Sequence, residues 1–263
     1  MDSTRIDTSV PHPARRYSYW LGGKDHFAAD RASGDAIAAA FPAVVELARA
    51  NRAFLRRAVR AVAEAGVRQF LDIGTGLPAP DNTHEVAQAV APESRVVYVD
   101  NDPIVMMHAQ ALLVGDPRGH TAYLEADVRD PAAILRRSGL DLTRPTGLLL
   151  VAVLHFLHDD EQVEGIVRTL VDALAPGSQV VLSHGTMDFS DAEGIAAYEK
   201  MFAAGGTDVR ARSRATLEGY LRGLDILEPG VVPVADWRPD DPAAARPVSR
   251  DLGIYGVVAR KPV

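Results

Sequence analysis

The sequence predicts an α/β fold with a doubly wound, mostly parallel seven-stranded sheet, an antiparallel hairpin at its C-terminal edge and a helical N-terminal extension. Short apolar runs alternate with segments of helical spacing, which is typical of a parallel sheet covered by helices. A loop with two glycines, Gly74 and Gly76, follows the first apolar run. The last two runs, 224–234 and 254–259, have no helical segment between them, as expected of an antiparallel pair.

Each element has a local signal. Helices are indicated by apolar residues at helical spacing and by capping residues, such as Asn82 with Glu85 or an Asp-Pro pair, directly after a strand. They are predicted over 43–63 and 82–90, after Asp102 and Asp130, over 163–174, and after Ser190 and Ser213. Strands are predicted at 70–73, 95–99, a run that ends at Asp127, 147–154, 179–183, 224–234 and 254–259.

Composition limits the class of protein. The chain has 263 residues, of which 47% are hydrophobic, so it is long enough for one large domain with an extension. We expect a helical extension or lid at 1–65 and the main domain at 66–263. A net charge of −7 argues against a nucleic-acid partner, because phosphate binding depends on clustered Lys and Arg. Zero cysteines and no apolar run of the ~20 residues that span a bilayer favour a cytoplasmic protein without a membrane partner.

Three carboxylates, Asp72, Asp100 and Asp127, come at the ends of three successive predicted strands. In an open parallel sheet, ligands bind outside the carboxyl ends of the strands. Gly74 and Gly76 have no Cβ, so a ligand can lie directly on this part of the backbone. A carboxylate at the end of the next strand, Asp100, can accept hydrogen bonds from both hydroxyls of a ribose. Together these residues predict a nucleoside pocket.

The motif Asp72-x-Gly74-x-Gly76, with Asp100 and Asp127, resembles class I S-adenosylmethionine-dependent methyltransferases. Four further blocks resemble a bacterial family of such proteins whose substrate is unassigned. They are 17–31, which contains Leu-Gly-Gly-Lys-Asp, 51–55, Asn-Thr-His-Glu at 82–85, and Leu-His-Phe at 154–156. The resemblance implies a Rossmann-like methyltransferase that binds S-adenosyl-L-methionine and transfers its methyl group by direct displacement to an acceptor, expected to be a small molecule.

The resemblance also implies roles for single residues. Gly74 and Gly76 would lie under the methionine part of the cofactor, Asp100 would hold the ribose, Asp127 would accept from the adenine amine, and Asp72 would orient the loop or the cofactor's amino group. The other cofactor-binding residues that it implies are Tyr17, Gly23, Lys24, Arg52, Asn82, Asn101, Val128 and Ala152. The N-terminal block is expected to form a lid, in which Lys24, Arg31 or Arg52 pairs with the cofactor carboxylate. Asn51 and Arg52 fit solvated helix positions equally well.

Histidine is the side chain best suited to remove a proton from an acceptor hydroxyl near neutral pH. His155, just after the fourth predicted strand, is the first candidate for this base, with His158 and His184 in reserve. A hydrogen-bonded structural histidine is the alternative for each of them. A metal site of His155, His158, Asp159 and Asp160 competes with a helix cap at the two aspartates, and no metal is expected.

Two rival functions remain open at this stage. The segment Gly74-Thr-Gly-Leu-Pro-Ala79 satisfies the G-x-G-x-x-A fingerprint of nicotinamide oxidoreductases. That fingerprint opens directly into a helix, whereas Pro78 and Pro80 delay the helix here, and Asp72 would repel phosphate. A binding protein that senses S-adenosylmethionine without catalysis is the second rival. The identity of the acceptor and the oligomeric state have no signal in the sequence.

Overall fold

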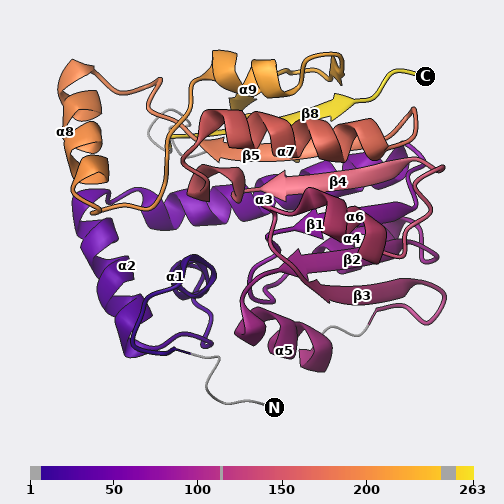
Figure 1. Ribbon diagram of the computed structural model, residues 1–263, viewed down its shortest axis with the longest axis horizontal. Coiled ribbons are helices and arrows are strands. Elements are labelled where there is room, and N and C mark those ends of the chain that lie inside the picture. Colours follow the sequence, from indigo (N-terminus) through magenta and orange to yellow (C-terminus); the bar gives the residue numbers. More distant parts are fainter. Residues whose placement is uncertain (1–6, 113–114, 244–252) are drawn as a thin grey trace.

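The computed structural model describes residues 7–112, 115–243 and 253–263 (Figure 1). Within these residues, one sheet has the strand order β3-β2-β1-β4-β5-β8-β6, and β7 also pairs with β8. Strands β1 to β5 are parallel, and β8 runs antiparallel to β5, β6 and β7. The strands are β1 Gln69–Ile73, β2 Arg95–Asp100, β3 His120–Glu125, β4 Thr146–Val151, β5 Gln179–Gly185, β6 Asp225–Ile226, β7 Val232–Pro233 and β8 Ile254–Arg260. The predicted mostly parallel α/β sheet with antiparallel C-terminal strands is confirmed.

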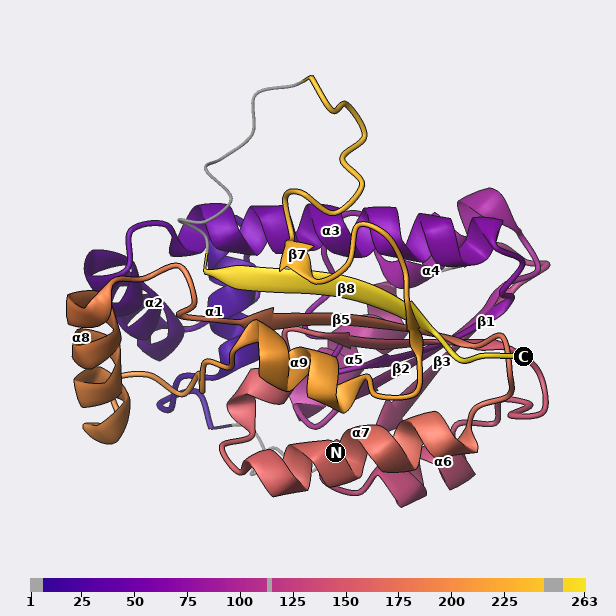
Figure 2. The ribbon, with the colours of Figure 1, turned by 90° about the horizontal axis from the view of Figure 1, so that it is seen from above.

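Helices cover both faces of the sheet. Figure 2 shows α3 and α4 on one face and α6, α7 and α9 on the other. The helices are α1 Pro13–Trp20, α2 Ala28–Ala40, α3 Val44–Glu64, α4 Thr83–Val90, α5 Pro103–Leu112, α6 Pro131–Arg137, α7 Asp160–Ala173, α8 Ala192–Ala203 and α9 Arg214–Tyr220, with a 3₁₀ turn η2 at Leu154–Phe156. Because both faces are covered, β1 is buried at every residue and β4 at all but its last, without the alternation of a half-exposed strand. No helix of the described residues has the length and apolar character needed to cross a membrane.

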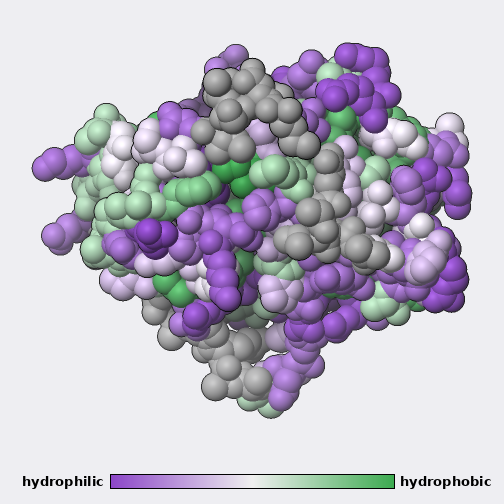
Figure 3. Space-filling model, turned by 90° about the horizontal axis from the view of Figure 1, so that it is seen from below, coloured by the Kyte–Doolittle hydropathy of each residue, from purple (hydrophilic) through white to green (hydrophobic). Residues whose placement is uncertain are grey.

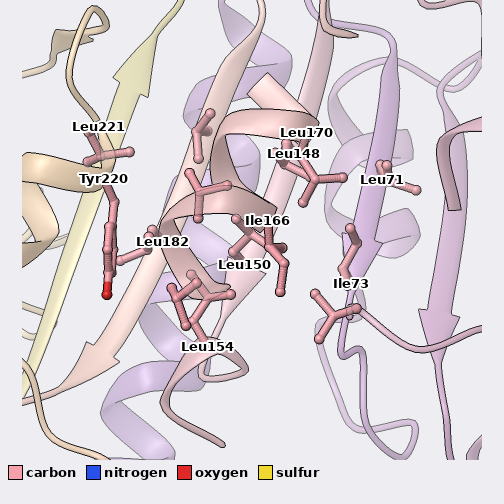
Figure 4. Close-up of a cluster of buried hydrophobic side chains, with 14 of the residues drawn as sticks. Leu71, Ile73, Leu148, Leu150, Leu154, Ile166, Leu170, Leu182, Tyr220 and Leu221 are labelled. Carbon is pink, nitrogen blue, oxygen red and sulfur yellow. The ribbon is translucent and has the colours of Figure 1, made fainter. Parts of the chain in front are cut away.

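The larger core lies between the sheet and α7. Figure 4 shows Leu148 and Leu150 of β4 against Ile166 and Leu170 of α7, all of them buried. The opposite core packs Phe54 and other residues of α3 on the sheet, with the ring of Trp237 edge-on to Phe54. These two cores fix the strands, and therefore fix where each strand ends.

Several predicted boundaries are wrong. The strand expected over 224–234 is two short strands, because Pro229, which has no N–H to pair, and Gly230, at φ 91°, lie in its middle. The third strand ends at Glu125, before Asp127, and the fourth at Val151, where Ala152 takes a positive φ. Ser190 does not cap α8, since the side chain of Asp191 accepts from the Gly194 N–H instead.

The N-cap of α9 gives a first testable prediction. Ser213 caps α9 as expected, and its Oγ accepts from the Thr216 N–H at 3.2 Å. Ser213→Ala should lower the free energy of unfolding by about 1 kcal/mol, because that N–H loses its partner. Urea unfolding monitored by circular dichroism measures the change. Ser190→Ala, at the position that does not cap α8, is the matched control and should change stability by less than about 0.5 kcal/mol.

Three helices, α1, α2 and α8, gather at the carboxyl ends of the parallel strands (Figure 1). The chain crosses from β1 to the neighbouring β2 on one side, and β4 lies on the other side of β1. The strand order therefore reverses between β1 and β4, which is where ligands bind in doubly wound sheets.

Candidate active site

A cavity of about 1100 Å³ lies at this end of the sheet. The loops after β1 to β5 form its floor, and α1, α2, α8 and the segment 206–209 contribute to its walls. Pockets for small molecules generally measure about 300 to 1000 Å³. The cavity therefore has room for a nucleoside-sized molecule and a second ligand.

The loop after β1 brings bare backbone to the cavity. Gly74 has φ 73°, and a Cβ there would lie 2.4 Å from Cγ2 of Val153, so only glycine fits beneath that side chain. Gly76 has φ 69°, and the nearest heavy atom to its would-be Cβ is the Ala14 Cβ at 4.0 Å. Both glycines line the cavity, and neither carries atoms that would exclude a ligand.

Asp100 ends β2 and is held by two backbone donors. Its Oδ2 accepts from the Gly76 N–H and its Oδ1 from the Asp102 N–H, each at 2.9 Å. Burial raises the pKa of this carboxyl, and the two N–H donors oppose that rise. Each carboxylate oxygen has a further lone pair, so Asp100 can still accept from two hydroxyls in the cavity.

Asp127 and its neighbours form the cavity wall after β3. Asp127 also lines the cavity, but it is 41% exposed and pairs with Arg129 at 3.1 Å. Val128 is buried and supplies an apolar surface, and Asn101 is exposed after β2. Asp127, which the resemblance assigns to the adenine amine, thus lies on cavity lining that combines an acceptor with the apolar face of Val128.

Asp72, near the end of β1, is a buried carboxylate. Its Oδ2 accepts from the Thr83 hydroxyl at 2.6 Å. Burial raises its pKa to about 6, while Thr83 and the nearby charge of Arg52 act in the opposite direction. Because Asp72 lines the cavity, its charge acts directly on any cation bound there.

Arg52 of α3 holds the loop between β1 and α4. Its Nε donates to the Pro80 carbonyl, and its Nη2 donates to Ala79 O and to Asn82 Oδ1 at 3.1 and 3.0 Å. These bonds leave Nη1 of Arg52 available to a ligand, and Arg52 lines the cavity. Asn82 itself does not line the cavity; it stands at the N-cap of α4, its N–H donates to Glu85, and its Oδ1 accepts from Arg52 and from the Ala79 N–H.

Tyr17 and Asn51 join α1 to α3. The Tyr17 hydroxyl donates to the Ala48 carbonyl at 2.9 Å and accepts from Asn51 Nδ2 at 3.1 Å. Asn51 is 1% exposed, so it is not a solvated position, and its Oδ1 is a buried acceptor without a hydrogen bond among the described residues. Since both residues line the cavity, an unused acceptor there favours a ligand with N–H donors.

Ala152 marks the end of β4 with φ 53°, which is uncommon for a residue with a Cβ. Its N–H donates to Ser183 Oγ at 3.0 Å, and this bond holds the strained turn. Ala152 and Val153 therefore face the cavity beside the glycine loop.

The position of His155 argues against a general base. Its Nδ1 accepts from the Gly185 N–H at 3.4 Å, so the neutral ring carries its proton on Nε2. Burial and the charge of Arg212 lower the pKa of His155 to about 3. At neutral pH the ring lining the cavity is thus an N–H donor with little affinity for a second proton.

The reserve histidines lie differently. His184 is fully buried and does not line the cavity; its Nε2 accepts from Arg212, and burial lowers its pKa well below the usual value. His158 is exposed at the cavity, and its Nε2 donates to the Asp208 carbonyl at 3.0 Å. Asp159 caps α7. The histidine, aspartate and glutamate side chains of the described residues form no group of three or more that could hold a metal ion.

Three residues that the sequence predicts at the cofactor lie away from the cavity. Gly23, Lys24 and Arg31 are exposed and do not line it. A Cβ on Gly23 would lie 2.3 Å from the Ser18 hydroxyl, which explains the glycine by packing alone. The cavity is instead approached by α1, whose buried Arg16 forms an ion pair with Asp208.

The fold and this cavity define a class of protein: a Rossmann-like methyltransferase fold with a nucleoside-sized site at the switch point. The chain matches the model of the S-adenosyl methyltransferase family over residues 1–262 and belongs to that family. The cofactor that the family's description names is S-adenosylmethionine.

Two solved structures are similar to this chain over nearly its whole length. A DUF574 family protein from Streptomyces avermitilis is 48% identical, with a TM-score of 0.90, covering 98% of this chain and 100% of that chain. A candidate methyltransferase from Thermobifida fusca is 41% identical, with a TM-score of 0.86, covering 98% and 97%.

A curated relative matches over a shorter segment. A candidate S-adenosyl-L-methionine-dependent methyltransferase of Mycolicibacterium gilvum is 32% identical over 148 residues, which is 54% of this chain and 46% of the relative. This chain thus matches about half the length of that protein.

Proposed function

We propose that the protein binds S-adenosyl-L-methionine at the ends of β1 to β4 and transfers its methyl group to a small-molecule acceptor by direct displacement. The observation that carries the proposal is the acceptor-rich half of the cavity, where Asp72, Asp100, Asp127 and Asn51 surround two bare glycines. The cofactor has a cationic sulfonium, an ammonium, two ribose hydroxyls and an adenine amine. A wall of oxygen acceptors is what such a molecule requires.

The residues present fit the cofactor part by part. Asp100 would hold the ribose, and Asp127 would accept from the adenine amine after it turns from Arg129. The cofactor's carboxylate would lie against Arg52 Nη1, and its ammonium would donate to Asn51 Oδ1. Asp72 would add a negative charge beneath the cationic centre. The cofactor supplies an electrophilic methyl group on sulfur.

The protein's task in this reaction is alignment and exclusion of water. The turn at Ala152 would fix the floor beside the methyl group, and α1 would act as a lid. The ion pair of Arg16 with Asp208 links α1 to the segment after α8, and so joins two walls of the cavity. No covalent intermediate on the protein is required.

Calorimetry with S-adenosylmethionine, S-adenosylhomocysteine and NAD tests the binding step. We expect both adenosyl ligands to bind and NAD not to bind, because α4 begins only at Thr83 and does not follow directly from the glycine loop, as the dinucleotide fingerprint requires. Formation of S-adenosylhomocysteine with metabolite extracts tests the transfer. Binding without any turnover would support a sensor instead, and binding of NAD alone would overturn the proposal.

Substitution of Asn51 gives a prediction for the methionine part of the site. Asn51→Leu should weaken S-adenosylmethionine binding about tenfold, because the ammonium loses one acceptor and the Tyr17 hydroxyl loses one donor. Asn51→Asp keeps an acceptor at that place and should retain more affinity. Calorimetry compares the variants, and equal affinity of wild type and Asn51→Leu would place the ammonium elsewhere.

A further inference from the structure

Part of the cavity lining differs from the part that holds the carboxylates. It comes largely from the end of α1, from α2 and α8, and from the segments at the end of β5 and around η2, and we call it the acceptor half. Its lining is mainly apolar or aromatic and includes Trp20, Ile37, Phe41, Met187, Phe189 and Met201.

Figure 3 shows the same contrast on the surface. Hydrophobic colouring gathers at the end of the molecule where α2 and α8 lie, on the left, and the opposite end is mostly hydrophilic. Alanines such as Ala36, Ala40 and Ala197 line the cavity from these helices. Small side chains on α2 and α8 leave space between them for an apolar molecule.

The ionisable groups of the acceptor half already have polar partners, and His158 donates to the Asp208 carbonyl. Arg16 and Asp208 pair with each other. The Tyr198 hydroxyl donates to Val209 O at 2.8 Å and accepts from the Ala211 N–H. An acceptor that carries a charged group away from its reacting atom would thus find no free counter-charge among these groups, and burying an unpaired charge is costly.

His155 supplies one polar contact at the boundary between the two halves. Its Nδ1 accepts a hydrogen bond from the Gly185 N–H, and its Nε2–H has no hydrogen-bond acceptor among the described residues. The groups that face the ring are His184, Phe156 and Arg212, and none of them is an anion that would favour a protonated ring. His155 therefore offers a single N–H donor to a ligand oxygen.

We propose that the acceptor half binds a lipophilic molecule whose phenol- or enol-type hydroxyl is the methyl acceptor, with its oxygen held by the Nε2–H of His155. This proposal rests on the proposed function. The hydroxyl gives its proton to bulk water, because His155 cannot take it. The acceptor oxygen then forms a bond to the methyl carbon as the carbon–sulfur bond breaks, and that electron pair remains on sulfur. The products are a methyl ether and S-adenosylhomocysteine.

The hydroxyl class follows from the lack of a base. A phenol ionises on its own with a pKa near 10, whereas an alkyl alcohol does not ionise without a strong base. A hydrogen bond to the ionised oxygen and the nearby positive sulfonium both lower the acceptor's pKa in the site. An acidic hydroxyl therefore suits this lining.

The binding test uses Trp20, which lines the cavity, as a fluorescent probe. With the protein saturated by S-adenosylhomocysteine, 1-naphthol should quench this fluorescence and bind at least about tenfold more tightly than the anion 1-naphthoate. Trp20→Phe should remove the signal, since the other tryptophan, Trp237, is fully buried in the α3 core. Preference for naphthoate would overturn the proposal.

Two charge substitutions on α8 locate the site. Met201→Glu places a charge in the acceptor half and should weaken naphthol binding about tenfold or more. Ile195→Glu, on the same helix but 41% exposed and outside the cavity, should leave it unchanged. Binding of S-adenosylhomocysteine should be the same in both variants. Loss of its binding would therefore count against the proposed cofactor site, and not against the proposed site for the lipophilic acceptor. Equal naphthol affinity in the two variants would overturn the proposal that the acceptor half binds the lipophilic molecule.

A series of naphthols and phenols of different acidity tests the hydroxyl chemistry. The midpoint of the pH profile of methyl ether formation should move with the pKa of each phenol. If the midpoint is instead the same for every phenol and disappears in His158→Ala, His158 acts as a base. That result would overturn the proposal that the hydroxyl ionises without a base on the protein. Phenols that bind but yield no methyl ether would overturn it as well.

Discussion

Asp100→Ala should weaken binding of S-adenosylmethionine at least about a hundredfold, because the two charge-assisted hydrogen bonds proposed to the ribose would contribute roughly 1.5 to 3 kcal/mol each. The same side chain holds the Gly76 and Asp102 N–H groups, so the glycine loop also loses a brace. Asp100→Asn keeps one acceptor oxygen and should cost about tenfold. Calorimetry with S-adenosylmethionine and S-adenosylhomocysteine measures both variants.

Asp127→Ala is the matched control at the next strand. Its carboxylate is 41% exposed and paired with Arg129, so the loss of affinity should be at most about tenfold. Circular dichroism establishes that each variant is folded. If a folded Asp100→Ala protein binds the cofactor within about twofold of the wild type, the ribose does not lie on Asp100.

Asp72→Asn should stabilise the protein at neutral pH by about 3 kcal/mol. The pKa of Asp72 rises from 3.8 to about 6 on folding, and each pKa unit corresponds to about 1.4 kcal/mol. A carboxyl with a raised pKa favours the folded state fully below its unfolded pKa, and this contribution is lost as the pH rises through the folded value. The advantage of the variant should thus be absent below about pH 4 and complete above about pH 7.

Denaturant unfolding across this pH range measures the difference. Asp116→Asn is the control of opposite sign, because its partner Arg118 lowers the pKa of Asp116 to about 2. Asp72→Asn should be more stable but should bind the cationic cofactor more weakly, because it lacks the negative charge. The affinity of the wild type for the cofactor should rise as the pH increases through about 6. A stability difference independent of pH would mean that folding does not shift the pKa of Asp72.

Much of the fold could be predicted because its signals are local. Apolar runs and capping residues such as Asn82 and Ser213 act over a few residues, and the structure places them as expected. The residues after β1, β2 and β3 meet at one edge of the sheet, as the parallel order requires. Boundaries failed where one residue changed the backbone, as at Ala152 and Pro229.

The rest of the site depends on contacts between distant parts of the chain. Arg16 and Asp208 are 192 residues apart in the sequence, and no pattern near either residue indicates the other. Asn51 fits an amphipathic helix in the sequence, and only its contact with Tyr17 reveals an unused acceptor. Gly23 and Lys24 belong to a recognisable block, yet local packing of Gly23 on Ser18 accounts for the glycine.

Part of the acceptor half rests on helices that carry none of the site's carboxylates. The carboxylates and glycines belong to the loops of the parallel sheet, whereas Ile37 and Met201 belong to α2 and α8, which lie outside its two helical layers. Substitutions on α2 and α8 can therefore reshape the apolar wall without disturbing the residues proposed to hold the methyl donor. Acceptor selectivity and donor binding can therefore be changed independently of each other at these positions.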